Sequence, residues 1–307
     1  MPPVFAADLS NNALLAITGD DARSFLHGQF TSDVEALASG EAQWSGWCTP
    51  KGRLVATFLL ARRAEGFLIL LPAEIAVAFA KRLAMFVLRS KVKIADVSES
   101  FARLGITGED APSQIMARWG ETPAPMRCTE KDGSVCIALD EHRFVAIVAR
   151  SSADPWLDGL EKRASRDEWD WAVIQSGVPI IVAATQEAFV PQMANLDLVG
   201  AVSFKKGCYP GQEIVARTQY RGTLKRRMAL VHVAGLERPQ PGQSVYSEMF
   251  GDQAAGTIVN GAPSPTGGFD ALVVAQVESL QREDLRWNAP DGPRMEILQQ
   301  PPPARAS

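Results

Sequence analysis

The chain has 307 residues, of which 46% are hydrophobic and 21% charged, and its formal net charge is −4 at pH 7. This composition is ordinary for a soluble globular protein with two or three domains or one large interlocked body. No apolar run reaches the length that spans a bilayer, and the N-terminus lacks the basic start and apolar core of a signal peptide, so we expect a cytoplasmic protein without a membrane partner.

Hydrophobic patterning in the first third of the chain predicts two helices and several strands. Asp20 and Asp21 mark a helix start, because acidic residues are favoured in a first turn. A second helix is predicted over residues 73–89, where apolar residues recur at Ile75, Phe79, Leu83 and Phe86. Aliphatic or alternating runs predict strands at residues 13–18, 44–48, 52–60, 66–71 and 91–94. Strand, strand, helix and strand in this order form a ferredoxin-like half, which is an α+β pattern.

The middle of the chain is less regular. Prolines and glycines over residues 109–133 predict an irregular connection. A strand pair is expected at residues 134–139 and 143–149. Helices are expected at residues 155–164 and 167–176, and Gly177-Val178-Pro179 ends the second of them.

The last quarter of the chain has a different sequence pattern. From residue 225 onward, short strands alternate with turn signals, which predicts a small β-barrel. The tail at 299–307 is rich in proline and is expected to be disordered. The predicted domains are therefore a body over 1–224, a barrel over 225–298 and this tail.

The most informative segment surrounds a single thiol, Cys208. Lys205 and Lys206 precede it, and Pro210 suits the first turn of a helix that Gly222 can end. We expect Cys208 to lie just outside the helix N-terminus, where the helix dipole and the two lysines favour the thiolate. The segment therefore predicts a functional cysteine with a reactive thiol, although a lone cysteine is often only a small, buried hydrophobic residue.

The other cysteines and the histidines suggest no metal site. Cys48, Cys128 and Cys136 form no CxxC pair, so neither a disulfide framework nor a zinc ribbon is predicted. An iron–sulfur cluster held by this chain alone would need four thiolates from distant positions, and we expect none. The three histidines, His27, His142 and His232, are scattered.

The Cys208 segment resembles a motif of the YgfZ family, whose members are relatives of the glycine-cleavage T-protein, an aminomethyltransferase. The resembling motif is Lys206-Gly207-Cys208-Tyr209, followed by Gly211-Gln212-Glu213. Further similar segments lie at residues 17–22, 25–34, 48–53, 87–92, 189–197, 203–206 and 220–226. The ordered combination runs from about residue 12 to residue 227 and is specific, whereas each short piece alone would be weak.

This resemblance implies an α+β fold and a function. The fold would be a T-protein-like body of interleaved ferredoxin-like subdomains around a central cavity, followed by the small barrel. The implied cofactor is tetrahydrofolate, and the implied partners are iron–sulfur client enzymes, including tRNA-modifying ones. Cys208 and Lys206 would carry the chemistry. The folate-binding residues would be Arg53, Trp169, Gln175, Gln192, Asn195, Gln212, Glu213, Arg217, Tyr220 and Arg221.

Three positions bear on how the folate would be held. Trp169 lies eight residues before Gly177, as does a folate-facing tryptophan of the family, but a core tryptophan is the alternative. A second tryptophan of the family falls at Asn12 here. Gln175 replaces the acid that the wider fold uses to read the pterin, and its amide lacks the charge assistance of a carboxylate.

Charge is distributed unevenly along the chain. Residues 205–227 contain seven basic residues and one acid, which is +6, and the rest carries −10. A second basic stretch without acids covers residues 81–93. Each is either a solvated face or an anion site that would attract a folate glutamate tail or an RNA backbone. The acidic body argues against general nucleic-acid binding, so a small polyanion is favoured and no direct nucleic-acid partner is expected.

Three hypotheses follow. The favoured one is a tetrahydrofolate-binding accessory factor for iron–sulfur enzymes that uses Cys208, and not a classical enzyme. The second is a folate-dependent one-carbon transferase, although residues 49–53 lack the acid that the T-protein uses at its reacting centre. The third is a non-catalytic interaction protein with a vestigial folate pocket.

Overall fold

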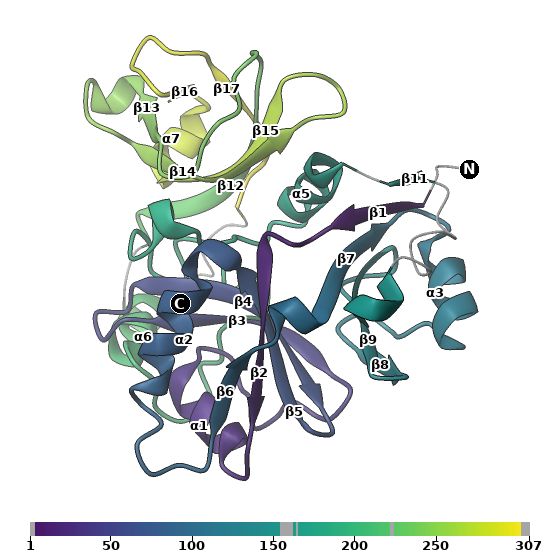
Figure 1. Cartoon of the computed structure of the whole chain (residues 1–307). Helices are drawn as coiled ribbons and strands as arrows, with labels where there is room; N and C mark the ends of the chain where they lie inside the picture. Colours follow the sequence, from purple (N-terminus) through teal and green to yellow (C-terminus); the bar gives the residue numbers. More distant parts are fainter. Residues whose placement is uncertain (1–3, 154–161, 164, 222–223, 302–307) are drawn as a thin grey trace. The chain divides into compact units, whose positions relative to one another are not determined.

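A computed structural model describes residues 4–153, 162–163, 165–221 and 224–301 (Figure 1). The described chain divides into two units, each built from discontinuous segments. Unit 1 comprises Met1–Gln29, Asp33–Trp44 and Phe58–Trp169, and unit 2 comprises Phe30–Ser32, Ser45–Thr57 and Asp170–Ser307. The domain boundary expected between residues 224 and 225 stays a prediction.

The described residues form three β-sheets, and the first has five strands. Their order is β3 (Ala42–Cys48), β4 (Leu54–Arg63), β5 (Gly66–Pro72), β2 (Asn12–Thr18) and β6 (Lys93–Asp96). The pairs β4–β5, β5–β2 and β2–β6 are antiparallel. The predicted strands and the helix start near Asp20 are confirmed, since helix α1 covers Ala22–Gln29.

Helix α2 (Ala73–Ala84) is shorter than predicted. Ile75, Phe79 and Leu83 are buried as expected, and the Phe79 ring meets Phe58 of β4 edge-on at 5.5 Å. Phe86, predicted to lie on the same apolar face, is 44% exposed. The helix cannot extend to residue 89 as predicted, because Leu88 adopts φ 46°, which a right-handed helix does not accommodate.

The second sheet belongs to unit 1 and has six strands. Their order is β11 (Lys162–Arg163), β1 (Phe5–Asp8), β7 (Phe101–Thr107), β10 (Arg143–Ala149), β9 (Ser134–Ala138) and β8 (Cys128–Lys131). Helix α3 (Ala111–Trp119) packs Ile115 and Trp119 into the core beside Phe144. The strand pair predicted at 134–139 and 143–149 is confirmed as β9 and β10.

The predicted irregular connection over residues 109–133 is wrong, because that segment contains α3 and β8. Pro112 lies in the first turn of α3, where its missing N–H breaks no hydrogen bond. Gly120, with φ 84°, ends the helix in a left-handed conformation. A proline that suggested a loop therefore starts a helix.

The remaining predicted helices have different outcomes. The helix predicted at 167–176 is confirmed as α5 (Arg166–Gln175). The helix predicted at 155–164 lies outside the described residues except at Lys162 and Arg163, which form β11 and not a helix. Short 3-10 turns cover Ser98–Ser100, Arg150–Ser152, Ala183–Thr185 and Glu248–Phe250. Within the described ranges, no helix is long and apolar enough to cross a membrane.

The third sheet belongs to unit 2 and is antiparallel throughout. Its order is β16 (Leu285–Trp287), β13 (Ser244–Ser247), β14 (Gly256–Pro263), β15 (Phe269–Gln276), β12 (Arg226–Val233) and β17 (Met295–Gln299). Leu280 of helix α7 (Val277–Arg282) packs in its core. The predicted short strands are confirmed, and their closure into a barrel stays a prediction. β17 runs through Gln299, and the predicted tail beyond Pro301 lies outside the described residues.

Candidate functional site

The thiol of Cys208 lies at the surface of unit 2 between two buried side chains. Lys206 and Tyr209 are 8% and 6% exposed, whereas Lys205, Gly207 and Cys208 are exposed. The backbone on both sides of the thiol is therefore anchored in the protein. This arrangement presents Cys208 to solvent from a fixed position, as a reactive thiol requires.

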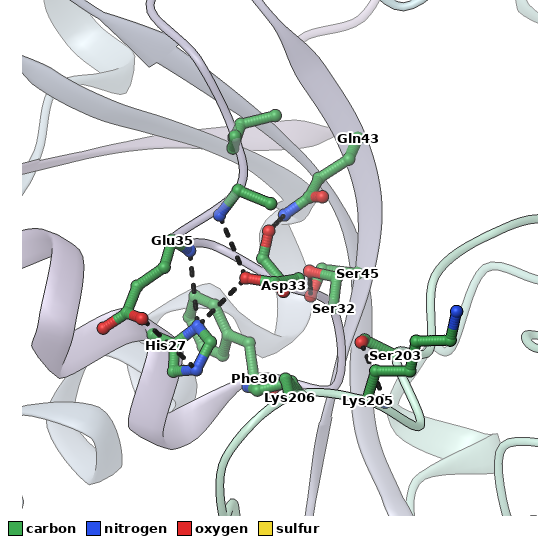
Figure 2. Close-up of polar contacts among 12 residues, drawn as sticks. His27, Phe30, Ser32, Asp33, Glu35, Gln43, Ser45, Ser203, Lys205 and Lys206 are labelled. Carbon is green, nitrogen blue, oxygen red and sulfur yellow. Dashed lines mark hydrogen bonds and ion pairs between the residues drawn. The ribbon is translucent and has the colours of Figure 1, made fainter.

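Lys206 is the anchor on the N-terminal side of the thiol. Its Nζ donates a hydrogen bond to the carbonyl oxygen of Phe30 at 2.6 Å (Figure 2). The same ammonium lies 5.0 Å from the centroid of the Tyr209 ring, within the range of a cation–π interaction. Lys206 thus ties residues 206 and 209 to Phe30, and its charge is directed into the unit.

The chain just before Lys205 is anchored by Thr31, which is fully buried. The Thr31 hydroxyl donates to the carbonyl of Ala201 at 2.6 Å and accepts from the amide of Gly46 at 2.9 Å. The amide of Ser203 donates to the Thr31 carbonyl at 2.8 Å. A buried hydroxyl that both donates and accepts satisfies its polar requirement and joins three separate stretches of chain.

The chain after Cys208 approaches the loop at residues 49–53 very closely. Gly211 has φ 82°, and a Cβ on it would lie 2.5 Å from the Thr49 carbonyl oxygen and 2.6 Å from the Gly52 Cα. Gly52 has φ 70°, and a Cβ there would lie 2.9 Å from the Ile214 Cβ. Two glycines therefore face each other, because no side chain fits between these backbones.

Helix α6 (Gln212–Arg221) begins later than predicted. Pro210 lies in the preceding turn, because Gly211 takes a left-handed conformation that cannot belong to a right-handed helix. The amide of Val215 donates to the Gly211 carbonyl at 3.2 Å, which starts the helical bonding pattern. Cys208 therefore precedes the helix by four residues. The predicted helix end at Gly222 lies outside the described residues.

The other three cysteines differ from Cys208 in their surroundings. Cys48 and Cys136 are buried, and desolvation raises the pKa of both thiols well above the usual value. Burial also raises the pKa of Cys128 to about 11, with a further rise from Glu130 and an opposing effect of Arg63. Among the described residues, no group of three His, Cys, Asp or Glu side chains could hold a metal ion.

We expect a thiol reagent such as Ellman's reagent at pH 8 to react rapidly with one thiol of the native protein. A raised pKa keeps a cysteine in its unreactive neutral form at this pH, and that applies to Cys48, Cys128 and Cys136. All 4 thiols should react after unfolding. Cys208→Ala should remove the rapid phase, and a rapid phase that survives this change would contradict the assignment.

Comparison with known proteins assigns the chain to a family. Residues 3–124 match the profile described as the GCVT N-terminal domain. Over 253 residues, the chain is 31% identical to the tRNA-modifying protein YgfZ of Escherichia coli strain K12, which covers 80% of this chain and 77% of that protein. The chain belongs to the YgfZ family. The protein of the same name from Shigella flexneri matches equally well.

The fold of this YgfZ-family chain is that of the T-protein. A crystal structure of glycine cleavage system aminomethyltransferase T from Bartonella henselae superposes with a TM-score of 0.79. The match covers 98% of this chain and 86% of that protein, at 16% identity. The predicted T-protein-like α+β fold is thereby confirmed, since structure is retained where sequence has diverged.

Three residues predicted to bind folate are occupied by backbone partners in unit 2. Arg53 donates to the Ala188 carbonyl at 2.8 Å, and Asn195 donates to the Met228 carbonyl at 2.8 Å. Gln192 is buried and donates through Nε2 to the Val215 carbonyl at 2.6 Å. In the described part of the chain, Gln192 Oε1 is buried without a hydrogen-bond partner. These contacts give the three side chains partners within the protein, and a folate contact stays a prediction.

Five of the predicted residues lie on α6. Gln212 donates to the Lys206 carbonyl at 3.3 Å and so belongs to the anchor of the Cys208 segment. Glu213, Arg217 and Tyr220 are exposed, and the Tyr220 ring meets Phe204 edge-on at 6.3 Å. The side chain of Arg221 lies outside the described residues. The exposed face of α6, which follows Cys208 in the chain, therefore presents charged side chains and an aromatic ring to solvent.

The two predicted residues on α5 differ in their packing. Trp169 is 4% exposed and belongs to unit 1, where a Cβ on Gly105 of β7 would lie 2.4 Å from its indole. This packing is that of a core tryptophan, and its predicted contact with folate stays a prediction. Gln175 belongs to unit 2, is half-buried and donates through Nε2 to the carboxylate of Asp270 at 2.9 Å.

Sequence reasoning missed three residues that hold this region together. Thr31 and Tyr209 lie inside motifs shared with the family, but nothing in their spacing shows that both are buried anchors. Asp270 is 3% exposed within β15. An acid in the apolar run Phe269–Gln276 was a usable signal, because a buried carboxylate needs hydrogen-bond donors.

Proposed function

We propose that this protein is a tetrahydrofolate-binding accessory factor for the assembly or repair of iron–sulfur enzymes, and that it acts through the thiol of Cys208. The observation that carries the proposal is an exposed thiol that lies between two buried residues, Lys206 two positions before it and Tyr209 directly after it. A surface cysteine without a role needs no such anchoring. The thiol is presented to a partner from a fixed backbone.

The family supports the choice of partner. Curated relatives at 31% identity are called tRNA-modifying proteins. The clients that we propose are iron–sulfur enzymes that modify tRNA. The protein would work in the cytoplasm on such client enzymes, without contacting nucleic acid itself. Folate is proposed from the T-protein fold, with Trp169, Gln175, Arg53 and the α6 residues as its candidate contacts.

The structure of the loop at residues 49–53 favours this function over one-carbon transfer. The loop is a tight turn in which the Gly52 amide donates to the Thr49 carbonyl at 2.9 Å. It carries Lys51 and Arg53 and no carboxylate. Aminomethyl transfer needs a group that orients the folate nitrogen and accepts a proton, and this turn supplies no such group. We therefore propose binding of folate without turnover.

The test is a calorimetric titration of the reduced protein with tetrahydrofolate. The expected dissociation constant is on the order of micromolar. Trp169→Phe keeps an aromatic ring against Gly105 and should bind with a modest loss, whereas Trp169→Ala should lose binding. Because the alanine variant also loses about 3–5 kcal/mol of packing, its folded state must be verified by circular dichroism at the titration temperature. Absence of binding to the wild-type protein would exclude the folate function.

A further inference from the structure

Asp270 is a buried carboxylate that collects hydrogen bonds from two parts of unit 2. The indole Nε1 of Trp171 donates to its Oδ2 at 2.7 Å, and Nε2 of Gln175 donates to the same oxygen at 2.9 Å. The other oxygen, Oδ1, lies 2.7 Å from Nδ1 of His232. The side chain of Asp270 is 4% exposed. Both carboxylate oxygens are therefore occupied by donors from the protein.

The sequence builds this arrangement from two regular contacts. Trp171 and Gln175 are four residues apart on α5, so their side chains lie on one helix face. His232 of β12 and Asp270 of β15 are directly opposite each other in the antiparallel pair. Gly268 leaves room for the imidazole, since a Cβ on it would lie 3.0 Å from the ring. A helix face and a cross-strand pair thus meet at one carboxylate.

This contact determines how the Gln175 amide is oriented. A carboxylate oxygen accepts hydrogen bonds, so Gln175 must present Nε2 to Asp270 and cannot present Oε1. Oε1 then points away from the Asp270 carboxylate. The amide is half-buried, which leaves this oxygen available to a ligand. Donation to a charged acceptor also polarises the amide and makes Oε1 a stronger acceptor.

We propose that Asp270 is a positioning residue for folate, which fixes Gln175 so that its Oε1 accepts a hydrogen bond from an N–H group of the pterin ring. This inference rests on the folate binding proposed above. Gln175 is neutral, and Asp270 supplies a negative charge that acts on the pterin through its hydrogen bond with the Gln175 amide. The N3–H and 2-amino groups of the pterin are donors that match such an acceptor.

The competing explanation is that Asp270 only joins α5 to the sheet of unit 2. Both explanations predict that removal of Asp270 weakens the fold, so stability alone does not separate them. They differ in ligand specificity. A positioning role affects the pterin end of the ligand alone, whereas a structural role affects all folate fragments that the protein binds.

The experiment measures the binding of tetrahydrofolate, 6-methyltetrahydropterin and p-aminobenzoylglutamate by calorimetry and competition. Asp270→Asn keeps the shape of the side chain and removes its charge. We expect this substitution to weaken the binding of tetrahydrofolate and of the pterin fragment by roughly tenfold. The affinity for p-aminobenzoylglutamate should be unchanged. Trp171→Phe is the matched control, because it removes one donor to the same oxygen without altering the Gln175 amide.

Gln175→Glu provides a second test, because its effect on pterin binding should have opposite directions in the wild-type and Asp270→Asn backgrounds. In the wild-type background it places two carboxylates together and should weaken binding. In the Asp270→Asn background it moves the negative charge to position 175 and should restore binding of the pterin fragment. A purely structural role predicts no such reversal. If Asp270→Asn does not fold, Gln175→Met, which removes the same acceptor, should show the same loss confined to the pterin fragment.

The outcomes separate the two proposals. Failure of the wild-type protein to bind tetrahydrofolate overturns the folate function and this inference with it. Wild-type binding that Asp270→Asn leaves unchanged, or that it weakens equally for both fragments, overturns the role of Asp270 while folate binding stands. A loss confined to the pterin fragment, reversed by Gln175→Glu, supports the role.

Discussion

Cells whose only copy of this protein carries Cys208→Ala are expected to have the iron–sulfur enzyme activities of cells that lack the protein. Cys208 is exposed, so its replacement leaves no cavity and removes only the thiol. Surface substitutions of this kind change the free energy of unfolding by about 0.5 kcal/mol or less. The measurement is the activity of an iron–sulfur tRNA-modifying enzyme in cell extracts, together with the melting temperature of the purified variant.

The control for this loss is another cysteine of the same chain. Cys128 is partly buried, and burial raises its pKa to about 11, so it offers no reactive thiolate at neutral pH. Cys128→Ala should therefore retain the enzyme activities. Cys208→Ser, which keeps the size and polarity of the side chain, should fail as Cys208→Ala does. Normal enzyme activity in the Cys208→Ala cells would refute the proposed role of the thiol.

Gly211→Ala is expected to lower the free energy of unfolding by about 3 kcal/mol or more and to abolish the activity that depends on Cys208. A left-handed conformation costs an alanine about 1–2 kcal/mol. The new Cβ would also lie 2.5 Å from the Thr49 carbonyl oxygen, a backbone atom that cannot rotate away. The loop at residues 49–53 and the start of α6 must then separate. Urea denaturation of the purified variant measures the loss.

Gly200→Ala is the matched control for that substitution. Gly200 has φ 74° and also belongs to unit 2, but a Cβ on it meets nothing within 4 Å. Its replacement should cost only the conformational term of about 1–2 kcal/mol and should leave the activity intact. Equal losses from Gly200→Ala and Gly211→Ala would show that the close approach to Thr49 contributes nothing to stability.

Much of the fold was predictable because periodicity is a local property. The strands β9 and β10 and the helix α5 were predicted within one or two residues. The errors occurred where one local signal has two meanings. Pro112 was taken as a loop residue, but it lies in the first turn of α3. Phe86 continued the apolar period of α2, although the helix ends at Ala84.

The candidate site was predictable in part. The motif around Cys208 identified the thiol and its family before any contact was known. It did not distinguish the two lysines, although Lys205 is exposed and Lys206 is buried with its Nζ on the Phe30 carbonyl. Gln192 and Asn195 were assigned to a ligand, and the structure shows that backbone carbonyls use their amides. A polar residue in a motif looks the same in sequence whether its partner is a ligand or the main chain.

The sequence by itself determined the helix and strand types, the family and the identity of the exposed thiol. These depend on residue spacing and on short motifs, which need no knowledge of distant parts. Only the tertiary structure decided which groups surround the thiol and the Asp270 carboxylate. Thr31 bonds to Ala201 across 170 residues, and Gln175 bonds to Asp270 across 95. Local patterns do not specify such partners, because burial and hydrogen bonding between distant segments depend on how all the strands pair.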